Sequence, residues 1–224
     1  MKRTESGIYL PDRRDFLRLA STGALGAMAS RYARTQDIMV VKKKAAAAGG
    51  GNCVGSLCVD NDDIQSITGT ATPNISFDAG ANSNRILFAA LYTDFDAAVT
   101  TAVYGIEALS VVNAVGNRLF VYRLFDPASG GNTLTFTITG GTGRVLLGAV
   151  ALSGAHQSTP GNTDSATGSG TAITTPAISS GVTEMVLDFV QFGVDDPAQT
   201  LAPGGGQTEL FELAAVNQSA GACS

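Results

Sequence analysis

A period-two alternation of apolar and polar residues constrains this chain more than any other feature. In residues 132–140, NTLTFTITG, the apolar side chains of Leu134, Phe136 and Ile138 point to one face of an extended strand, and the intervening threonines point to the other. Residues 184–192, EMVLDFVQF, repeat the pattern with Met185, Leu187 and Phe189 facing inward. A helix would place these residues all around its axis. The alternation therefore predicts strands with one buried face.

Two further segments are apolar on both faces. Residues 85–92, RILFAALY, and 144–152, RVLLGAVAL, predict central strands covered on both sides by a second sheet, a loop or a subunit. Residues 117–125 predict another long strand, and turns rich in Gly, Pro, Asn and Asp separate these segments. The pattern predicts an all-β protein, an antiparallel β-sandwich of jelly-roll type.

Charge is distributed unevenly along the 224 residues. After Lys44 the chain carries only four basic residues, all arginines, against 15 acidic residues. An acidic body repels phosphate backbones, so we expect no nucleic-acid partner. Most of the basic residues therefore lie in the N-terminal segment, which needs its own explanation.

The N-terminal segment DRRDFLR resembles a twin-arginine (Tat) signal peptide. Arg13 and Arg14, followed by Phe16 and Leu17, match the motif of that family, whereas Asp12 stands where Ser or Thr is usual. The resemblance implies export of the folded chain to the periplasm, the extracellular space or the cell surface, with the Tat translocase and signal peptidase as transient partners.

The apolar run after this motif supports the same interpretation. Residues 19–29 are about half of the roughly 20 residues that span a bilayer. Ala27 and Ala29 supply the small residues of a cleavage site, so the mature chain is expected to begin near Ser30. The alternative is an N-terminal helix that stays attached and docks, as in a phage virion component.

These features divide the chain into three parts. We expect a helical or disordered signal over residues 1–29, an extension with a Lys/Ala/Gly-rich linker over 30–59, and the sandwich over 60–224. Within the extension, the apolar run at residues 37–41 is a candidate strand that pairs with the main body or with another molecule.

The chain contains three cysteines, which can form disulfides in the oxidising compartment that export implies. Cys53 and Cys58 are close enough in sequence to close a small disulfide loop, and the alternative is that Cys223 pairs with one of them. A zinc site is the weaker interpretation, because His156 is the only histidine. We assign no role to His156.

Carboxylates supply the only candidate metal or catalytic groups. Asp60 and Asp62 have the alternate spacing that begins a calcium loop, but the rest of such a loop is missing, so calcium is a weak possibility and no other cofactor is expected. Asp94 and Asp96 end a strand, where turn formation is the simpler role. Further acidic candidates are Glu107, Asp188, Asp195 and Asp196. Recognised catalytic motifs are missing, which predicts that the protein is not an enzyme.

A second resemblance covers most of the body. Asn84-Arg85, VYG at 103–105, Asp126-Pro127 and SGAHQSTP at 153–160 are similar to a β-sandwich module of secreted bacterial proteins and phage structural proteins. The resemblance implies a fold and an extracellular setting but no catalytic residues. Such modules close with one more strand after a segment like AAVNQSAGACS. Either that strand is missing here, or another segment supplies it.

The resulting functional hypothesis is an exported, non-enzymatic protein with a structural or adhesive role, assembling with its own copies into a fibre by strand addition. One alternative is a carbohydrate-binding module that recognises surface polysaccharide. Tyr92, Tyr104 and Tyr122 are its candidate stacking platforms, because the chain has no tryptophan. The other alternative is a phage virion surface or tail component.

Overall fold

The computed structural model describes part of the chain. The described residues are 2–3, 9–10, 36–44, 52–54, 57–158, 162–168, 184–193, 207–215 and 218–223. The chain divides into two units, Met1–Arg34 and Thr35–Ser224. In the first unit, β1 (Lys2–Arg3) pairs with β2 (Tyr9–Leu10). The fold described below belongs to the second unit.

The described strands of the second unit form three antiparallel sheets. The central sheet has the order β10 (Ser110–Val115), β11 (Leu119–Phe125), β7 (Ile86–Thr93), β13 (Arg144–Ser153), β5 (Leu57–Thr68) and β4 (Asn52–Val54). The threonine sheet has the order β6 (Asn74–Asp78), β12 (Gly131–Thr139), β8 (Ala98–Tyr104) and β9 (Glu107–Ala108). The outer sheet has the order β14 (Thr163–Gly168), β3 (Gln36–Lys44), β15 (Glu184–Gly193), β17 (Gln218–Cys223) and β16 (Glu209–Ala215).

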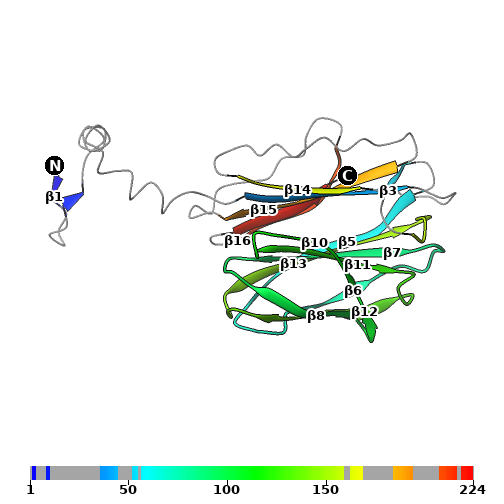
Figure 1. Ribbon diagram of the computed structural model, residues 1–224, viewed down its shortest axis with the longest axis horizontal. Coiled ribbons are helices and arrows are strands. Elements are labelled where there is room, and N and C mark those ends of the chain that lie inside the picture. Colours follow the sequence, from blue (N-terminus) through cyan, green and yellow to red (C-terminus); the bar gives the residue numbers. More distant parts are fainter. Residues whose placement is uncertain are drawn as a thin grey trace. The chain divides into compact units, whose positions relative to one another are not determined.

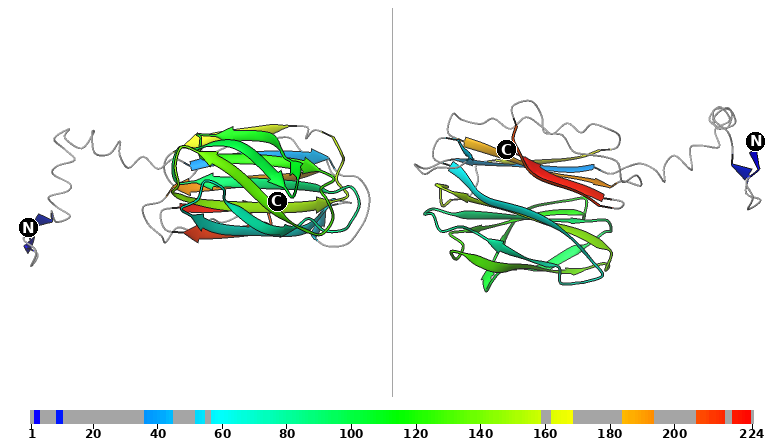
Figure 2. Two further views of the ribbon diagram at one scale, coloured as in Figure 1. Left: turned by 90° about the horizontal axis from the view of Figure 1, so that it is seen from below. Right: turned by 180° about the vertical axis from the view of Figure 1, so that it is seen from behind.

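The sheets are stacked as layers, with the central sheet between the other two (Figures 1 and 2). The described residues contain strands and turns and no helix, which confirms the all-β prediction. The central and threonine sheets form the predicted β-sandwich, and the outer sheet adds a third layer. The sequence had left open whether a sheet, a loop or a subunit covers the second face of the central strands.

Strand β7 shows why the central sheet needs a cover on both faces. Its residues Ile86, Phe88, Ala90 and Tyr92 belong to the core shared with the outer sheet. The residues between them, 87, 89 and 91, belong to the core shared with the threonine sheet. All eight residues of the strand are buried, so a sandwich of two sheets alone would leave half of them exposed.

The threonine sheet keeps the predicted alternation. Leu134, Phe136 and Ile138 of β12 are buried, whereas Thr133 and Thr139 are exposed. One face of this sheet therefore packs on the central sheet, and the other meets solvent.

The outer sheet combines segments that are far apart in sequence. Strand β3 pairs with β14 on one side and with β15 on the other. The candidate strand in the N-terminal extension therefore pairs with the main body of its own chain here. The segment near the C-terminus forms β17, which lies between β15 and β16. The buried side chains of Met185, Leu187 and Phe189 turn toward the central sheet, as the alternation predicts.

Candidate functional site

The signal motif lies outside the described residues. This applies to Arg13, Arg14, Phe16 and Leu17 and to the cleavage residues Ala27 and Ala29. Their role therefore stays a prediction from sequence. Asp195 and Asp196 also lie outside the described part.

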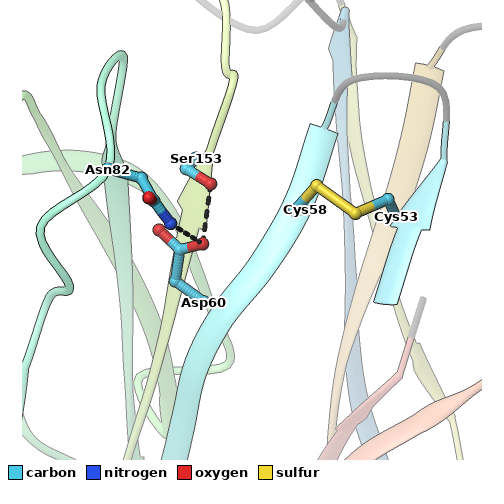
Figure 3. Close-up of a disulfide and its surroundings, with 5 residues drawn as sticks. All are labelled: Cys53, Cys58, Asp60, Asn82 and Ser153. Carbon is cyan, nitrogen blue, oxygen red and sulfur yellow. Dashed lines mark hydrogen bonds between the residues drawn. A yellow bond between two sulfur atoms is a disulfide. The ribbon is translucent and has the colours of Figure 1, made fainter. Parts of the chain in front are cut away.

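Cys53 and Cys58 are joined by a disulfide, one of the two pairings expected from sequence (Figure 3). The two residues are direct partners in the short ladder between β4 and β5, with Cα atoms 4.1 Å apart. Cys58 is buried and Cys53 is exposed. The disulfide holds the first residues of the central sheet against β5. The backbone of Cys223 pairs with Asp188 and Glu209 in the outer sheet.

Asp60 occupies an irregular position in β5, next to the disulfide-bonded hairpin (Figure 3). The ladder between β5 and β13 skips one residue here, because Asn61 pairs with Ala151 and Val59 pairs with Leu152. Asp60 is the extra residue of this bulge. Its Oδ1 accepts hydrogen bonds from the Ser153 hydroxyl at 2.6 Å and from the Asn82 amide at 3.0 Å.

These contacts make Asp60 a structural link between strands. Its Oδ2 is buried and has no hydrogen-bond partner among the described residues. A Cβ atom at Gly80 would lie only 3.1 Å from that oxygen, so the glycine makes room for the carboxylate.

Asp62 is the second carboxylate of the calcium-loop spacing, and burial together with the neighbouring Asp63 raises its pKa. The described residues include no group of three His, Cys, Asp or Glu side chains placed to hold a metal ion.

The carboxylates of Asp94 and Asp96 are used separately, at the opposite end of β7. Asp94 Oδ1 accepts a hydrogen bond from the backbone N–H of Arg144 at 3.1 Å. Asp96 Oδ1 forms an ion pair with Arg118 Nε at 3.1 Å. Both interactions hold turns in place, which matches the simpler role expected from sequence.

The glycine-rich turn GGTG, residues 140–143, leaves space for the segment that contains Asp94 and Phe95. A Cβ at Gly143 would lie 2.5 Å from Asp94 Oδ1, and one at Gly141 would lie 2.8 Å from the Phe95 ring. The sequence GGTG therefore permits close packing that larger residues would block.

Glu107, another acidic candidate, also holds a turn, because its carboxylate accepts a hydrogen bond from the backbone N–H of Ala128 at 2.9 Å.

Arg85 organises the loops at the end of the stack where β7 begins. Its guanidinium donates to the Asn82 carbonyl at 2.7 Å and to the Pro127 carbonyl at 2.7 Å, and it pairs with Asp126 at 3.3 Å. Gln157 Nε2 donates to the Arg85 carbonyl at 2.9 Å. We call Asn82, Arg85, Asp126, Pro127 and Gln157 the Arg85 cluster.

The Arg85 cluster brings together three of the four motifs that carry the module resemblance. The fourth motif contributes Tyr104, whose hydroxyl is fully buried. The single proton of this hydroxyl lies between the carbonyls of Gly130 at 2.7 Å and Phe77 at 3.0 Å, and the hydroxyl oxygen accepts from the N–H of Ala79 at 3.2 Å. The motif residues therefore connect loops and strand ends.

The three tyrosines considered as sugar platforms are occupied in packing. Tyr92 and Tyr104 are fully buried. Tyr122 is half-buried and makes an edge-to-face contact with Phe136, with ring centroids 5.4 Å apart. Burial raises the pKa of Tyr122. The faces of Tyr92 and Tyr104 are thus closed to a sugar ring.

Besides Asp60, two further half-buried charged residues have a buried polar atom with no hydrogen-bond partner among the described residues. Asp188 on β15 accepts a hydrogen bond from Gln207 through Oδ2, whereas its buried Oδ1 has no partner among the described residues. Burial raises the pKa of Asp188, and the Gln207 hydrogen bond opposes this shift. The Arg123 guanidinium lies over the Phe125 ring, and its Nε has no hydrogen-bond partner in the part of the chain that the structure describes. Burial lowers the pKa of Arg123. Asp188 was one of the acidic candidates, whereas Arg123 stands in an apolar strand that carries no motif.

A scan against protein-family models finds no match, and searches of curated proteins and of solved structures find none. The module resemblance therefore stays an expectation from the quoted motifs. Among the described residues, no helix has the length and apolar character needed to cross a membrane.

Proposed function

We propose that this protein is an exported, non-enzymatic building block of an extracellular or surface structure, in which β3 completes the outer sheet of a neighbouring copy. The observation that carries this proposal is the position of β3. It pairs with β15 along its whole length, from Gln36 opposite Phe192 to Lys44 opposite Glu184, and β14 pairs with its other edge.

A strand in this position contributes the same contacts whether it comes from its own chain or from another one. Backbone hydrogen bonds between strands provide affinity in strand addition, and side chains on alternate positions provide specificity. Donation from one copy to the next is heterologous, so repeated donation produces a chain of subunits. The outer sheet is therefore suited to assembly without any additional interface.

The hydrogen bonding of the turns and strand ends supports a structural role. Asp60, Asp94, Asp96 and Glu107 each accept a hydrogen bond or form an ion pair that holds a strand or turn. The Arg85 cluster has the same character. These residues support the shape of the stack, and this is the basis for proposing a non-enzymatic role.

The strand order supports a jelly-roll connectivity for the two inner sheets. In the central sheet the order β5, β13, β7, β11 corresponds to the first, eighth, third and sixth strands of that fold. In the threonine sheet β6, β12, β8 and β9 correspond to its second, seventh, fourth and fifth strands. Strand β10 then follows β9 into the central sheet. We adopt the jelly roll as the proposed connectivity on this basis.

The export part of the proposal is tested in a bacterium with a working Tat system. The full chain should appear outside the cytoplasm with a mass that corresponds to a start near Ser30. The variant Arg13→Lys/Arg14→Lys should accumulate inside the cell. Mature protein that retains Met1 would instead support the virion-docking alternative.

The assembly part is tested by electron microscopy of the exported protein. Val40→Pro should abolish assemblies, because proline removes a backbone donor in the middle of β3. Val40→Thr is the matched control and should assemble normally, since threonine is also β-branched. Unchanged assemblies in the proline variant would refute strand addition through β3.

A further inference from the structure

We infer that the solvent-facing side of the threonine sheet is a second interface, through which fibres of this protein associate side by side. This inference rests on the strand-addition function proposed above, and it identifies the partner as the same face of another copy. We call this surface the threonine face. Its central residues are Ser76, Thr101, Val103, Thr133, Thr135 and Thr137.

The threonine face lies on the side of the stack away from the outer sheet, because the central sheet separates the two (Figures 1 and 2). Leu134 and Phe136 are buried toward the central sheet, so the threonines that alternate with them point to solvent. Strand addition through β3 takes place in the outer sheet. A fibre built in this way therefore leaves the threonine face of each copy available for another contact.

The side chains of the threonine face form regular rows across the strands. Thr135 lies opposite Asn74 of β6 and Val103 of β8. Thr137 lies opposite Thr101, whose hydroxyl donates a hydrogen bond to the Thr137 hydroxyl at 2.8 Å. All of these side chains are short. The face is therefore even, and no long side chain would hold a second sheet away from it.

The threonine sheet carries very little charge. In β6, β12, β8 and β9 the only charged residues are Asp78 and Glu107. Both lie toward the end of the sheet where β12 begins, and both bind backbone N–H groups, Asp78 that of Gly80 at 2.8 Å and Glu107 that of Ala128 at 2.9 Å. The middle of the face therefore presents no charge to a partner.

The other two layers carry the charge of this acidic chain. Strand β5 of the central sheet has three acidic residues, and β15 and β16 of the outer sheet have two each. Copies that met through those strands would bring like charges together, whereas two threonine faces can approach without this repulsion. The distribution of charge thus favours the threonine face for contacts between copies.

The chemistry of the face also argues against other partners. The aromatic side chains of the four strands, Phe77, Tyr104 and Phe136, are all buried on the opposite side of the sheet. Sugar rings stack on exposed aromatic rings, and charged polymers bind through opposite charges. The threonine face offers neither, so a second copy of the same uncharged face is the partner that fits it.

Two threonine faces can pack together as two sheets do inside a protein. Packed sheets are about 10 Å apart, and short β-branched side chains interdigitate at such a contact. Burying the Thr101 and Thr137 hydroxyls costs little, because they bind each other, and the Thr100 hydroxyl donates to the Thr137 carbonyl at 3.1 Å. The contact is isologous, since both copies use the same surface.

The size of the face determines how strong one contact is. The nine residues of β12 extend over about 30 Å, and the four strands of the sheet cover a width of about 14 Å. Each face thus measures about 400 Å², and a pair of faces buries about 800 Å², less than the roughly 1,200 Å² of a stable interface. Single copies should therefore pair weakly, whereas fibres present many faces whose contacts add.

The decisive experiment places a charge on the face of the full exported chain and examines the fibres by electron microscopy. Thr135→Glu puts a carboxylate at the centre of every face. Because like charges across an interface are costly, this variant should form single fibres, with about a tenth or less of the side-by-side contacts of the parent. Bundles that persist in Thr135→Glu would overturn the inference.

Thr68→Glu is the matched control. Thr68 is an exposed residue of β5, and its neighbour Ile67 packs toward the threonine sheet, so the Thr68 side chain points the other way. The same substitution therefore adds the same charge outside the threonine face. Fibres of Thr68→Glu should bundle like those of the parent, and equal loss of bundles in both variants would contradict the assignment to this face.

A charge-reversal pair identifies the partner. Fibres of Thr135→Lys should also stay single, and mixing them with preformed Thr135→Glu fibres should restore bundles that contain both variants. High salt should separate these mixed bundles but not the parent bundles, because it screens the introduced ion pairs. Such a rescue shows that both variants are folded. Mixed fibres that stay single would overturn the inference.

The outcomes also separate this inference from the proposed function. Parent fibres that never associate sideways would remove the lateral interface but keep strand addition. If the parent forms no fibres, strand addition fails, and the face is then tested by sedimentation at rising protein concentration. Weak association of the parent that Thr135→Glu abolishes would still support the inference, and its absence would overturn it. A neutral polysaccharide that binds parent fibres but not Thr135→Glu fibres, without any bundles, would assign the face to sugar instead.

Discussion

Gly148 in β13 provides the space in which the Phe211 ring of β16 packs against the central sheet. A Cβ atom on Gly148 would lie 2.7 Å from Cζ of Phe211, closer than carbon atoms pack in proteins. Phe211 is buried in the core between the central and outer sheets. This pair therefore helps to determine how closely the outer sheet approaches the central one.

Gly148→Ala should destabilise the protein by about 1–3 kcal/mol, because the added methyl group forces Phe211 out of its position. The measurement is the midpoint of urea unfolding. Gly131→Ala is the matched control, since a Cβ at Gly131 in β12 meets nothing within 4 Å. Equal losses in the two variants would mean that the packing of Gly148 against Phe211 is unimportant.

Tyr104→Phe should cost about 1–3 kcal/mol, because it leaves buried backbone groups of Phe77, Ala79 and Gly130 without their hydroxyl partner. Thermal or urea unfolding measures the loss. Tyr122→Phe serves as the control, because Tyr122 is only half-buried, and its loss should be smaller. A Tyr104→Phe protein as stable as the parent would contradict this account.

Arg85→Lys should cost about 1.5–3 kcal/mol, because lysine cannot reproduce the planar set of bonds to Asn82, Asp126 and Pro127. The matched control is Arg118→Lys, which alters a more exposed ion pair with Asp96 and should cost less than about 1 kcal/mol. The free energy of unfolding of each variant measures the two losses. A larger loss for Arg118→Lys than for Arg85→Lys would contradict this ranking.

Asp188 should make stability fall as pH rises. Burial raises the pKa of this carboxyl in the folded protein, so the folded state binds the proton more tightly than the unfolded state. Stability is therefore highest below the ordinary pKa of aspartate, and it decreases as pH rises from that value through the raised one.

The variant Asp188→Asn tests this dependence. It should be more stable than the parent at neutral pH, and the difference should vanish in acid, where the parent carboxyl is protonated. Unfolding midpoints of both proteins across this pH range provide the measurement. A difference that grows toward low pH would show that the sign is wrong.

Local patterns in the sequence were sufficient to predict the strands. The alternation around Phe136 and Phe189 identified their buried faces, and the uninterrupted apolar residues from 85 to 92 identified a strand buried on both sides. These predictions succeed because the side chains of a strand alternate regardless of its neighbours. The spacing of Cys53 and Cys58 likewise allowed the hairpin disulfide as one of two pairings.

Long-range pairing could not be predicted in the same way. Nothing in the residues around Ile38 specifies β15 as a partner, and nothing near Asp60 indicates Ser153, which is 93 positions away. The sequence likewise gives no indication that the Phe211 ring packs in the space beside Gly148. Partners of this kind depend on the strand order, because residues become neighbours only after distant strands have paired.

The sequence by itself determined that this chain forms many strands with defined buried faces, an acidic body and a basic N-terminal segment. Only the tertiary structure decided that these strands form three layers and that β3 completes the outer one. It also decided that the candidate carboxylates Asp60, Asp94 and Asp96 support strands and turns. The physical reason is that periodicity is encoded between neighbouring residues, whereas packing and hydrogen bonding of side chains depend on contacts across the whole fold.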